Sequence, residues 1–184
     1  MSGLIGGPIV RKVLVSFLLL AASLASAQPA THKAKAGVCS AEPGYRALDF
    51  WVGDWDIYED GKPAGRQRVT QRLDDCTVIA EWLGPVGDNG IGYFAFDRSR
   101  NIWVQMWATN QVPYRGGVTI RETDPTYSGP GMRLLSKSAG QSLSRITLTA
   151  LDNHRARQVL ELSDDSGKTW KVIFDAEHRL GMKR

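Results

Sequence analysis

Few side chains in this sequence could carry out acid–base, nucleophilic or metal chemistry. Its histidines and cysteines are His32, His154, His178, Cys39 and Cys76. Neither cysteine has the spacing of a zinc or redox site, and no histidine–carboxylate cluster has metal-ligand spacing. The carboxylate pairs Asp74-Asp75 and Asp164-Asp165 lie in turn-like stretches, where solvation accounts for them. The sequence pattern therefore indicates neither a catalytic site nor a metal site.

Short runs of alternating apolar and polar residues fill the chain after residue 53. Turn residues separate them, as in Glu59-Asp60-Gly61 and Gly129-Pro130-Gly131. About ten strands at this spacing are typical of an all-β sandwich or barrel. No connection is long enough for a crossover helix, so the strands should be antiparallel and connected up-and-down. We expect an up-and-down β-barrel of about ten strands, which has no exposed edges, with a short helix within residues 42–52 closing one end.

Residues 1–27 have the pattern of a secretory signal. Arg11 and Lys12 precede an apolar run, residues 13–24, that ends in Ala25-Ser26-Ala27, a small-residue cleavage pattern. The run is too short for a membrane span; a retained amphipathic anchor is the alternative. Residues 28–40 are small and polar, which predicts a flexible leader, and residues 41–184 form the barrel domain. We expect a periplasmic or secreted protein that is not inserted in a membrane after signal removal.

The net charge limits the kinds of binding partner that we expect, and the cysteine content indicates a disulfide. Removal of the signal lowers the formal net charge from +4 to +2, because Arg11 and Lys12 leave with it. The remaining basic residues form no block, which argues against nucleic acid as a partner. Two cysteines in an exported chain favour one disulfide, Cys39–Cys76, between the N-terminal segment and the third strand. Buried free thiols are the alternative. The sequence leaves the oligomeric state open.

The first residues of the predicted barrel domain resemble those of a known family. "LDFWVGDWDIYEDGKPAG", residues 48–65, contains the Gly-x-Trp element Gly53-Asp54-Trp55, and "CTVIAEW", "NIWVQMW", "SRITLTAL" and "SDDSGKTWKVIFDAEHR" follow in order. This set resembles a bacterial family of exported proteins of uncharacterised function, related to the calycin (lipocalin-like) barrels, over most of residues 48–179. The resemblance implies a barrel with an interior pocket. It also implies structural roles at the closed end for Trp51, Gly53 and Trp55, with Arg179 stacked on Trp55.

The segment "SDDSGKTW", residues 163–170, matches the Asp-box of sialidases and other β proteins. A sialidase repeats this box, whereas it occurs once in this chain. Asp165 is expected to accept N–H bonds across the turn, Gly167 to supply a positive φ, and Trp170 to pack beneath. We assign these three residues structural roles.

If the more apolar face of each strand points inward, almost every strand charge lies outside. In residues 118–121 this rule places Val118 and Ile120 inside and Arg121 outside, and it also buries Leu73 and Val172. The polar residues left inside are Gln67, Gln71, Gln158 and, if the Trp103/Trp107 face points inward, Gln105. Acid–base or acyl-transfer catalysis needs a titratable group or a nucleophile in the pocket, and this face offers neither.

We therefore expect a binding protein without evident catalysis, which holds a small neutral or amphiphilic molecule inside the barrel. The predicted lining is Gln71, Trp82, Phe94, Gln105, Trp107, Tyr114, Met132 and Gln158. Amides supply donors and acceptors without net charge, and a charged ligand at the centre would lack a counter-ion. The ligand should be neutral or carry its charge at the mouth, and its binding should vary little with salt.

Two alternatives remain at this point. Barrels similar to nitrobindin bind haem through one histidine near the C-terminus, and His178 has the inward parity of the last strand. Against haem, the Gly-x-Trp-x-Gly-x-Gly pattern of that family fails after Trp55, and a surface histidine is the simpler expectation. The other alternative is an enzyme that uses residues at the pocket mouth, such as Asp97 or Asp124, although no pattern selects them. No other cofactor is expected.

Overall fold

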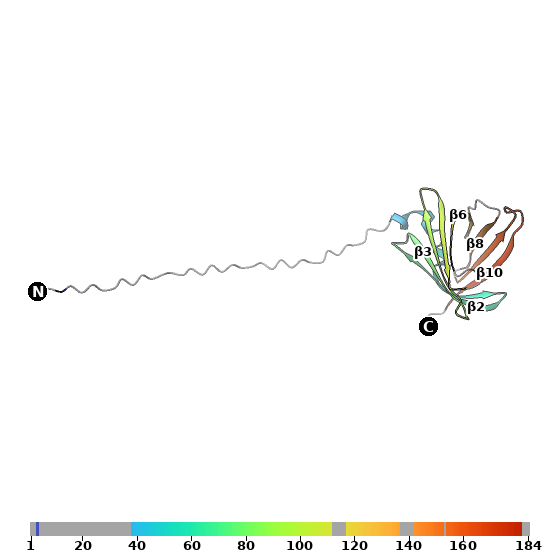
Figure 1. Cartoon of the computed structure of the whole chain (residues 1–184), viewed down its shortest axis with the longest axis horizontal. Coiled ribbons are helices and arrows are strands. Elements are labelled where there is room, and N and C mark those ends of the chain that lie inside the picture. The colour runs from blue at the N-terminus through green and yellow to red at the C-terminus, as the bar shows by residue number, and fades with distance from the viewer. Residues whose placement is uncertain (1–2, 4–37, 112–116, 137–141, 153, 182–184) are drawn as a thin grey trace. The chain divides into compact units, whose positions relative to one another are not determined.

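Ten antiparallel strands close into a barrel in which sequence neighbours pair and β1 pairs with β10 (Figure 1). The fold prediction is confirmed. The strands are β1 (Gly53–Glu59), β2 (Lys62–Arg72), β3 (Thr77–Leu83), β4 (Asn89–Asp97), β5 (Ile102–Thr109), β6 (Val118–Ser128), β7 (Gly131–Ser136), β8 (Leu143–Asp152), β9 (Arg155–Ser163) and β10 (Lys171–Leu180).

The computed structural model describes residues 3, 38–111, 117–136, 142–152 and 154–181, so the predicted site residue Tyr114 lies outside the described residues. The chain divides into two units, residues 1–33 and 34–184, and all the elements belong to the second. Before β1 the chain forms η1 (Val38–Ala41), α1 (Pro43–Arg46) and η2 (Asp49–Trp51). In the described ranges, no helix combines the length and apolarity needed to cross a bilayer.

The up-and-down order gives the barrel two different ends. One end, which we call the mouth, holds the connections β1–β2, β3–β4, β5–β6, β7–β8 and β9–β10. The other end, the floor, holds the remaining turns, the start of β1 and the end of β10. Segment 38–52 enters β1 at the floor, and its Leu48 and Trp51 are buried in the core. The short helical segment therefore closes this end, as predicted.

Two tryptophans and a histidine form the centre of the floor. Trp51 donates its indole N–H to Nδ1 of His178 at 3.2 Å, and Trp55 donates to the backbone oxygen of Trp51 at 2.8 Å. The rings of Trp55 and His178 meet edge to face, with centroids 6.0 Å apart. The Trp51 ring also packs edge-on against Phe94. Both tryptophans are thus buried at this end of the barrel, and their structural role remains a prediction.

The expected stack of Arg179 on Trp55 is wrong. The β1–β10 register pairs Ile57 with His178 and Asp56 with Arg179. Because side chains alternate along a strand, His178 turns inward to the tryptophans while Arg179 turns outward. Its guanidinium lies over the ring of Tyr58, 4.0 Å from the centroid.

Strand parity places most inner residues correctly, with three failures. Leu73 is 70% exposed because β2 ends at Arg72 and Leu73 enters the turn with a φ of 54°. Val172 is 51% exposed because an irregularity in the β9–β10 register between Val172 and Phe174 shifts the alternation. The third failure is the facing of β6, whose Val118 and Ile120 are exposed and do not point inward.

The predicted disulfide is confirmed. Cys39 in η1 is bonded to Cys76, directly before β3, with their Cα atoms 5.0 Å apart. The bond therefore fastens the floor segment to the β2–β3 turn.

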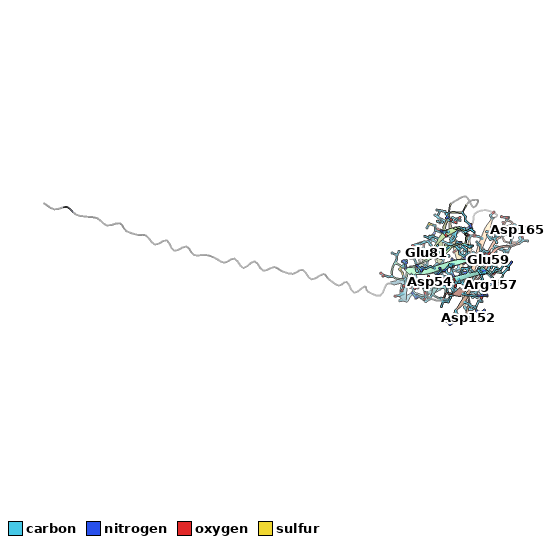
Figure 2. The ribbon with its side chains drawn as sticks, turned by 90° about the horizontal axis from the view of Figure 1, so that it is seen from below. Asp54, Glu59, Glu81, Asp152, Arg157 and Asp165 are labelled. Carbon is cyan, nitrogen blue, oxygen red and sulfur yellow. A yellow bond between two sulfur atoms is a disulfide. The ribbon has the colours of Figure 1, made fainter. Side chains whose placement is uncertain are left out.

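The β9–β10 turn has the expected Asp-box geometry. Asp165 accepts hydrogen bonds from the backbone N–H of Thr169 at 2.8 Å and from the hydroxyls of Thr169 and Ser163. These bonds lower the pKa of Asp165 to about 2. Gly167 has a φ of 86°, and Trp170 is half-buried beneath the turn with its indole N–H on the Gly167 carbonyl. Figure 2 labels Asp165, in the turn after β9, and Asp152, the last residue of β8.

Replacing both cysteines by serine should lower the free energy of unfolding by about 4 kcal/mol, because the bond closes a long loop in the unfolded chain. Urea unfolding of Cys39→Ser/Cys76→Ser against the oxidised wild type measures this. Two free thiols titrated in the unreduced, unfolded protein would contradict the pairing.

Trp55→Ala should cost about 3–5 kcal/mol, the usual range for a large aromatic side chain removed from a core. Val172→Ala, on the exposed face of β10, is the matched control and should change stability by about 0.5 kcal/mol or less. If Trp55→Ala unfolds like the wild type but loses ligand binding, the floor is a binding site and its structural assignment is wrong.

His178 should make stability depend on pH. Burial lowers its pKa from 6.5 to about 4. Between these values the unfolded chain binds a proton that the folded protein excludes, so stability falls as the pH falls from 6.5 to 4, by up to about 3 kcal/mol. His178→Gln should lose this part of the profile. Parallel wild-type and variant profiles between pH 7 and 4.5, measured by urea unfolding, would contradict the assignment.

Candidate functional site

The barrel interior contains a cavity of about 920 Å³ whose lining extends to the turns at the mouth. Its volume is in the range of pockets that enclose small organic ligands. The wall comes from eight strands, β1, β2, β3, β5, β6, β8, β9 and β10, together with the connections at the mouth. The floor residues Trp51, Trp55 and His178 are not part of this lining.

Aromatic and aliphatic side chains form the upper wall. They are Trp82, Trp107, Ile146, Leu160, Leu162, Ile173 and Phe174. Two glycines make room for the indoles: a Cβ on Gly65 would lie 2.7 Å from the Trp82 ring, and one on Gly90 would lie 2.3 Å from the Trp107 ring. The rings of Trp82 and Phe174 also meet edge to face. The indoles of Trp82 and Trp107 thus pack closely against the backbone at these glycines.

Four glutamines line the cavity: Gln67, Gln105 and Gln158 on the strands, and Gln111 after β5 at the mouth. Gln67 and Gln105 are buried, and the Oε1 atom of each has no hydrogen-bond partner among the described residues. An unpartnered buried polar group costs about 1–3 kcal/mol. These amides are therefore poised to bond water or a ligand.

Arg121 also lines the cavity, and its expected outward orientation is wrong. The β5–β6 register pairs Gln105 with Arg121 and Trp107 with Thr119. Thr119 and Arg121 therefore share the inner face, while Val118 and Ile120 are 61% and 67% exposed on the outer face. Apolar parity failed here because this strand carries its β-branched apolar residues on the solvent side.

The Arg121 guanidinium has no ion pair or hydrogen bond with any described residue, and burial lowers its pKa. Arginines on the outer face are different. Arg68 bonds Asp54 at 2.6 Å and Arg157 bonds Asp175 at 2.7 Å; Asp54 and Arg157 are labelled in Figure 2. The charge inside the barrel is thus left uncompensated while these outer charges are paired.

Carboxylates occur only at the rim of the cavity lining. Glu59, Asp60 and Asp88 come from the β1–β2 and β3–β4 ends at the mouth. Burial, then Asp60 and Asp175, raise the pKa of Glu59. Asp88 accepts a hydrogen bond from the side-chain amide of Gln111 at 3.0 Å. Within the described part of the chain, no group of three or more histidine, cysteine, aspartate or glutamate residues could hold a metal ion.

Four of the predicted ligand-binding residues line the cavity: Trp82, Gln105, Trp107 and Gln158. Phe94 and Met132 lie outside the lining and pack in the core. Gln71 also lies outside it and donates to the carboxylate of Asp49 at 2.7 Å. Whether the four cavity residues bind a ligand remains a prediction.

Gln67, Thr119 and Arg121 line the cavity, although they were not among the predicted lining residues. Gln67 carried a signal, since parity placed it inside. No feature of the sequence indicated which side chains of β6 point inward. β6 follows the long stretch 110–117, so no short turn sets its register to β5.

Neither proposed mouth carboxylate lies at the cavity. Asp97 binds Ser99 and Arg100 in the β4–β5 turn at the floor end, and these bonds lower its pKa to about 2. Asp124 is exposed on the outer face of β6. Neither residue is therefore placed to act on a ligand in the cavity.

His178 is not the surface residue that we expected, being only 1% exposed. Its Nδ1 accepts the Trp51 indole N–H, and its Nε2 is buried without a partner among the described residues. His178 is not part of the cavity lining, so its ring would not contact an iron atom held in the cavity.

A second hollow, of about 590 Å³, lies between α1 and the β4–β5 turn. Its charged residues already have partners: Arg46 pairs with Asp49 and Asp75, and Arg98 lies 3.3 Å from Glu42. The interior cavity, with its unpaired cation and amides, is therefore the stronger candidate site.

A comparison of the sequence with models of known protein families finds no match, and neither does a comparison with curated proteins.

Proposed function

We propose that this protein is an exported, lipocalin-like binding protein that holds a small amphiphilic molecule inside its barrel. One observation carries the proposal: a cavity of about 920 Å³ joins an apolar upper wall to two buried amide oxygens, on Gln67 and Gln105, that lack partners among the described residues. The Cys39–Cys76 disulfide supports export, because such bonds persist in oxidising compartments.

The two kinds of lining suit an amphiphilic ligand. Trp82, Trp107 and Phe174 offer flat apolar surface, and each methylene group buried there contributes about 0.8 kcal/mol to binding. The amides of Gln67 and Gln105 offer hydrogen bonds to one polar end of the molecule. A purely apolar ligand would leave those amides without partners.

Binding is better supported than catalysis. The described cavity lining contains no histidine, cysteine or serine. Its carboxylates, Glu59, Asp60 and Asp88, lie at the mouth, away from the buried amides. Haem bound through His178 is the less favoured alternative, because Trp51 occupies one ring nitrogen and the ring lies outside the cavity lining. Absorbance in the Soret region of freshly purified protein distinguishes the two.

The most direct experiment is native mass spectrometry of freshly purified protein, which should detect a co-purified small molecule. The neutral fluorophore N-phenyl-1-naphthylamine then measures the empty cavity, since its emission rises in an apolar site. Failure of this fluorophore to bind the unloaded protein would contradict a ligand cavity.

A pair of adjacent substitutions in β6 tests where binding occurs. Thr119→Trp places an indole on the inner face and should weaken N-phenyl-1-naphthylamine binding about tenfold or more, because the added ring takes up part of the cavity. Val118→Trp adds the same side chain on the outer face and should leave binding unchanged. Fluorescence titration measures both variants, and equal effects would place the site elsewhere.

A further inference from the structure

Besides the polar residues at its mouth, the cavity has a second set of polar residues at its deep end. On β2, β5, β6 and β9, the lining residues nearest the floor are Gln67, Gln105, Arg121 and Gln158. The next inward positions toward the floor are Val69, Trp103, Thr123 and Ala156, all buried outside the lining. The bottom of the cavity is therefore polar on four strands, and we call these four side chains the polar bottom.

The upper wall has the opposite character. Above the polar bottom, β5 and β9 continue toward the mouth with Trp107, Leu160 and Leu162, and β10 adds Ile173 and Phe174. A bound amphiphile can satisfy both regions only with its polar group down and its apolar body toward the mouth.

Arg121 determines the charge that suits the polar bottom. It is the only cation there, and no described residue forms an ion pair or hydrogen bond with it. The acidic lining residues, Glu59, Asp60 and Asp88, belong to the turns at the mouth. Because a half-buried charge without a counter-ion is unfavourable, an anionic group on the ligand would supply what the protein lacks.

Gln105 stands beside this cation. Arg121 and Gln105 are direct cross-strand partners on the inner face, and such partners have Cβ atoms about 4.5–5.5 Å apart. Guanidinium N–H groups match the two oxygens of a carboxylate, and Nε2 of Gln105 can donate one more bond to it. Oε1 of Gln105, which has no partner among the described residues, can accept a bond from a water molecule.

We propose that the ligand is an amphiphilic monocarboxylate, bound head-down with its carboxylate on Arg121 and Gln105 and its apolar body along Trp107 and Phe174 toward the mouth. This inference rests on the proposed function and replaces the neutral ligand expected from the sequence. One cation suits a monoanion better than a phosphate monoester, which carries a charge of about −1.5 to −2 at neutral pH.

The test uses 11-(dansylamino)undecanoic acid, whose dansyl group is at the end remote from the carboxylate, and its methyl ester. The wild type should bind the acid about tenfold more tightly than the ester, or better, since only the acid forms charge-assisted bonds. Arg121→Gln should reduce acid binding to the level of the ester and leave ester binding unchanged. Arg121→Lys should give an intermediate affinity, because lysine keeps the charge but loses the planar fork.

Arg133→Gln is the matched control. Arg133 is an exposed arginine on the outer face of β7, so this variant changes the net charge equally without altering the cavity. It should bind acid and ester like the wild type. If Arg133→Gln reduces acid binding as much as Arg121→Gln does, the effect is one of general charge and the proposal is overturned.

Other outcomes separate this inference from the proposed function. If N-phenyl-1-naphthylamine binds but acid and ester bind equally, the carboxylate proposal fails and the binding function stands. If neither the fluorophore nor either fatty-acid compound binds, both fail. Tighter binding of decyl phosphate than of decanoate, by competition with the dansyl acid, would overturn the monocarboxylate class.

Discussion

The hydrogen-bonded cluster of Trp51, Trp55 and His178 is the contact on which the rest of the structure depends. It joins the segment before the barrel to the first and last strands, and it fills the floor with aromatic rings. Because the floor is filled, the remaining interior space lies on the mouth side. The same cluster explains why the Gly-x-Trp element stands where it does: Trp55 needs the backbone oxygen of Trp51, four residues earlier, as its acceptor.

The interior follows two different rules on either side of the cavity bottom. Below it, apolar side chains such as Val69 and Leu148 pack closely, as a stable core requires. At the bottom itself, a cation and unpartnered amides break the rule that buried polar groups are satisfied. Proteins violate such rules mainly at functional sites. The polar bottom is thus better explained by a ligand than by stability.

The fold was predictable because alternation, turn residues and the absence of crossover helices all point to the same barrel. Inner residues of strands joined by short turns, such as Val78 and Met132, also followed from parity. Parity failed where a local event shifts it: a left-handed turn residue at Leu73 and a register irregularity at Val172.

The wrong prediction with the largest consequence for function was the outward orientation of Arg121. A rule that sends charges outward cannot find the one charge that a binding site needs inside. The only route to it was the register between β5 and β6, which the long connection 110–117 hides from the sequence. The amides were easier, because glutamine among inward apolar residues is conspicuous.

The floor also constrains the order in which the molecule can assemble. Trp51 and His178 are 127 residues apart in the chain, so their bond forms only after the last strand has joined the sheet. Contacts of such long sequence separation slow folding. The floor of the barrel is therefore completed by the segment before β1 and by β10 together. A ligand can occupy it only once the whole chain is in place, which makes ligand uptake a step that follows folding and not one that guides its start.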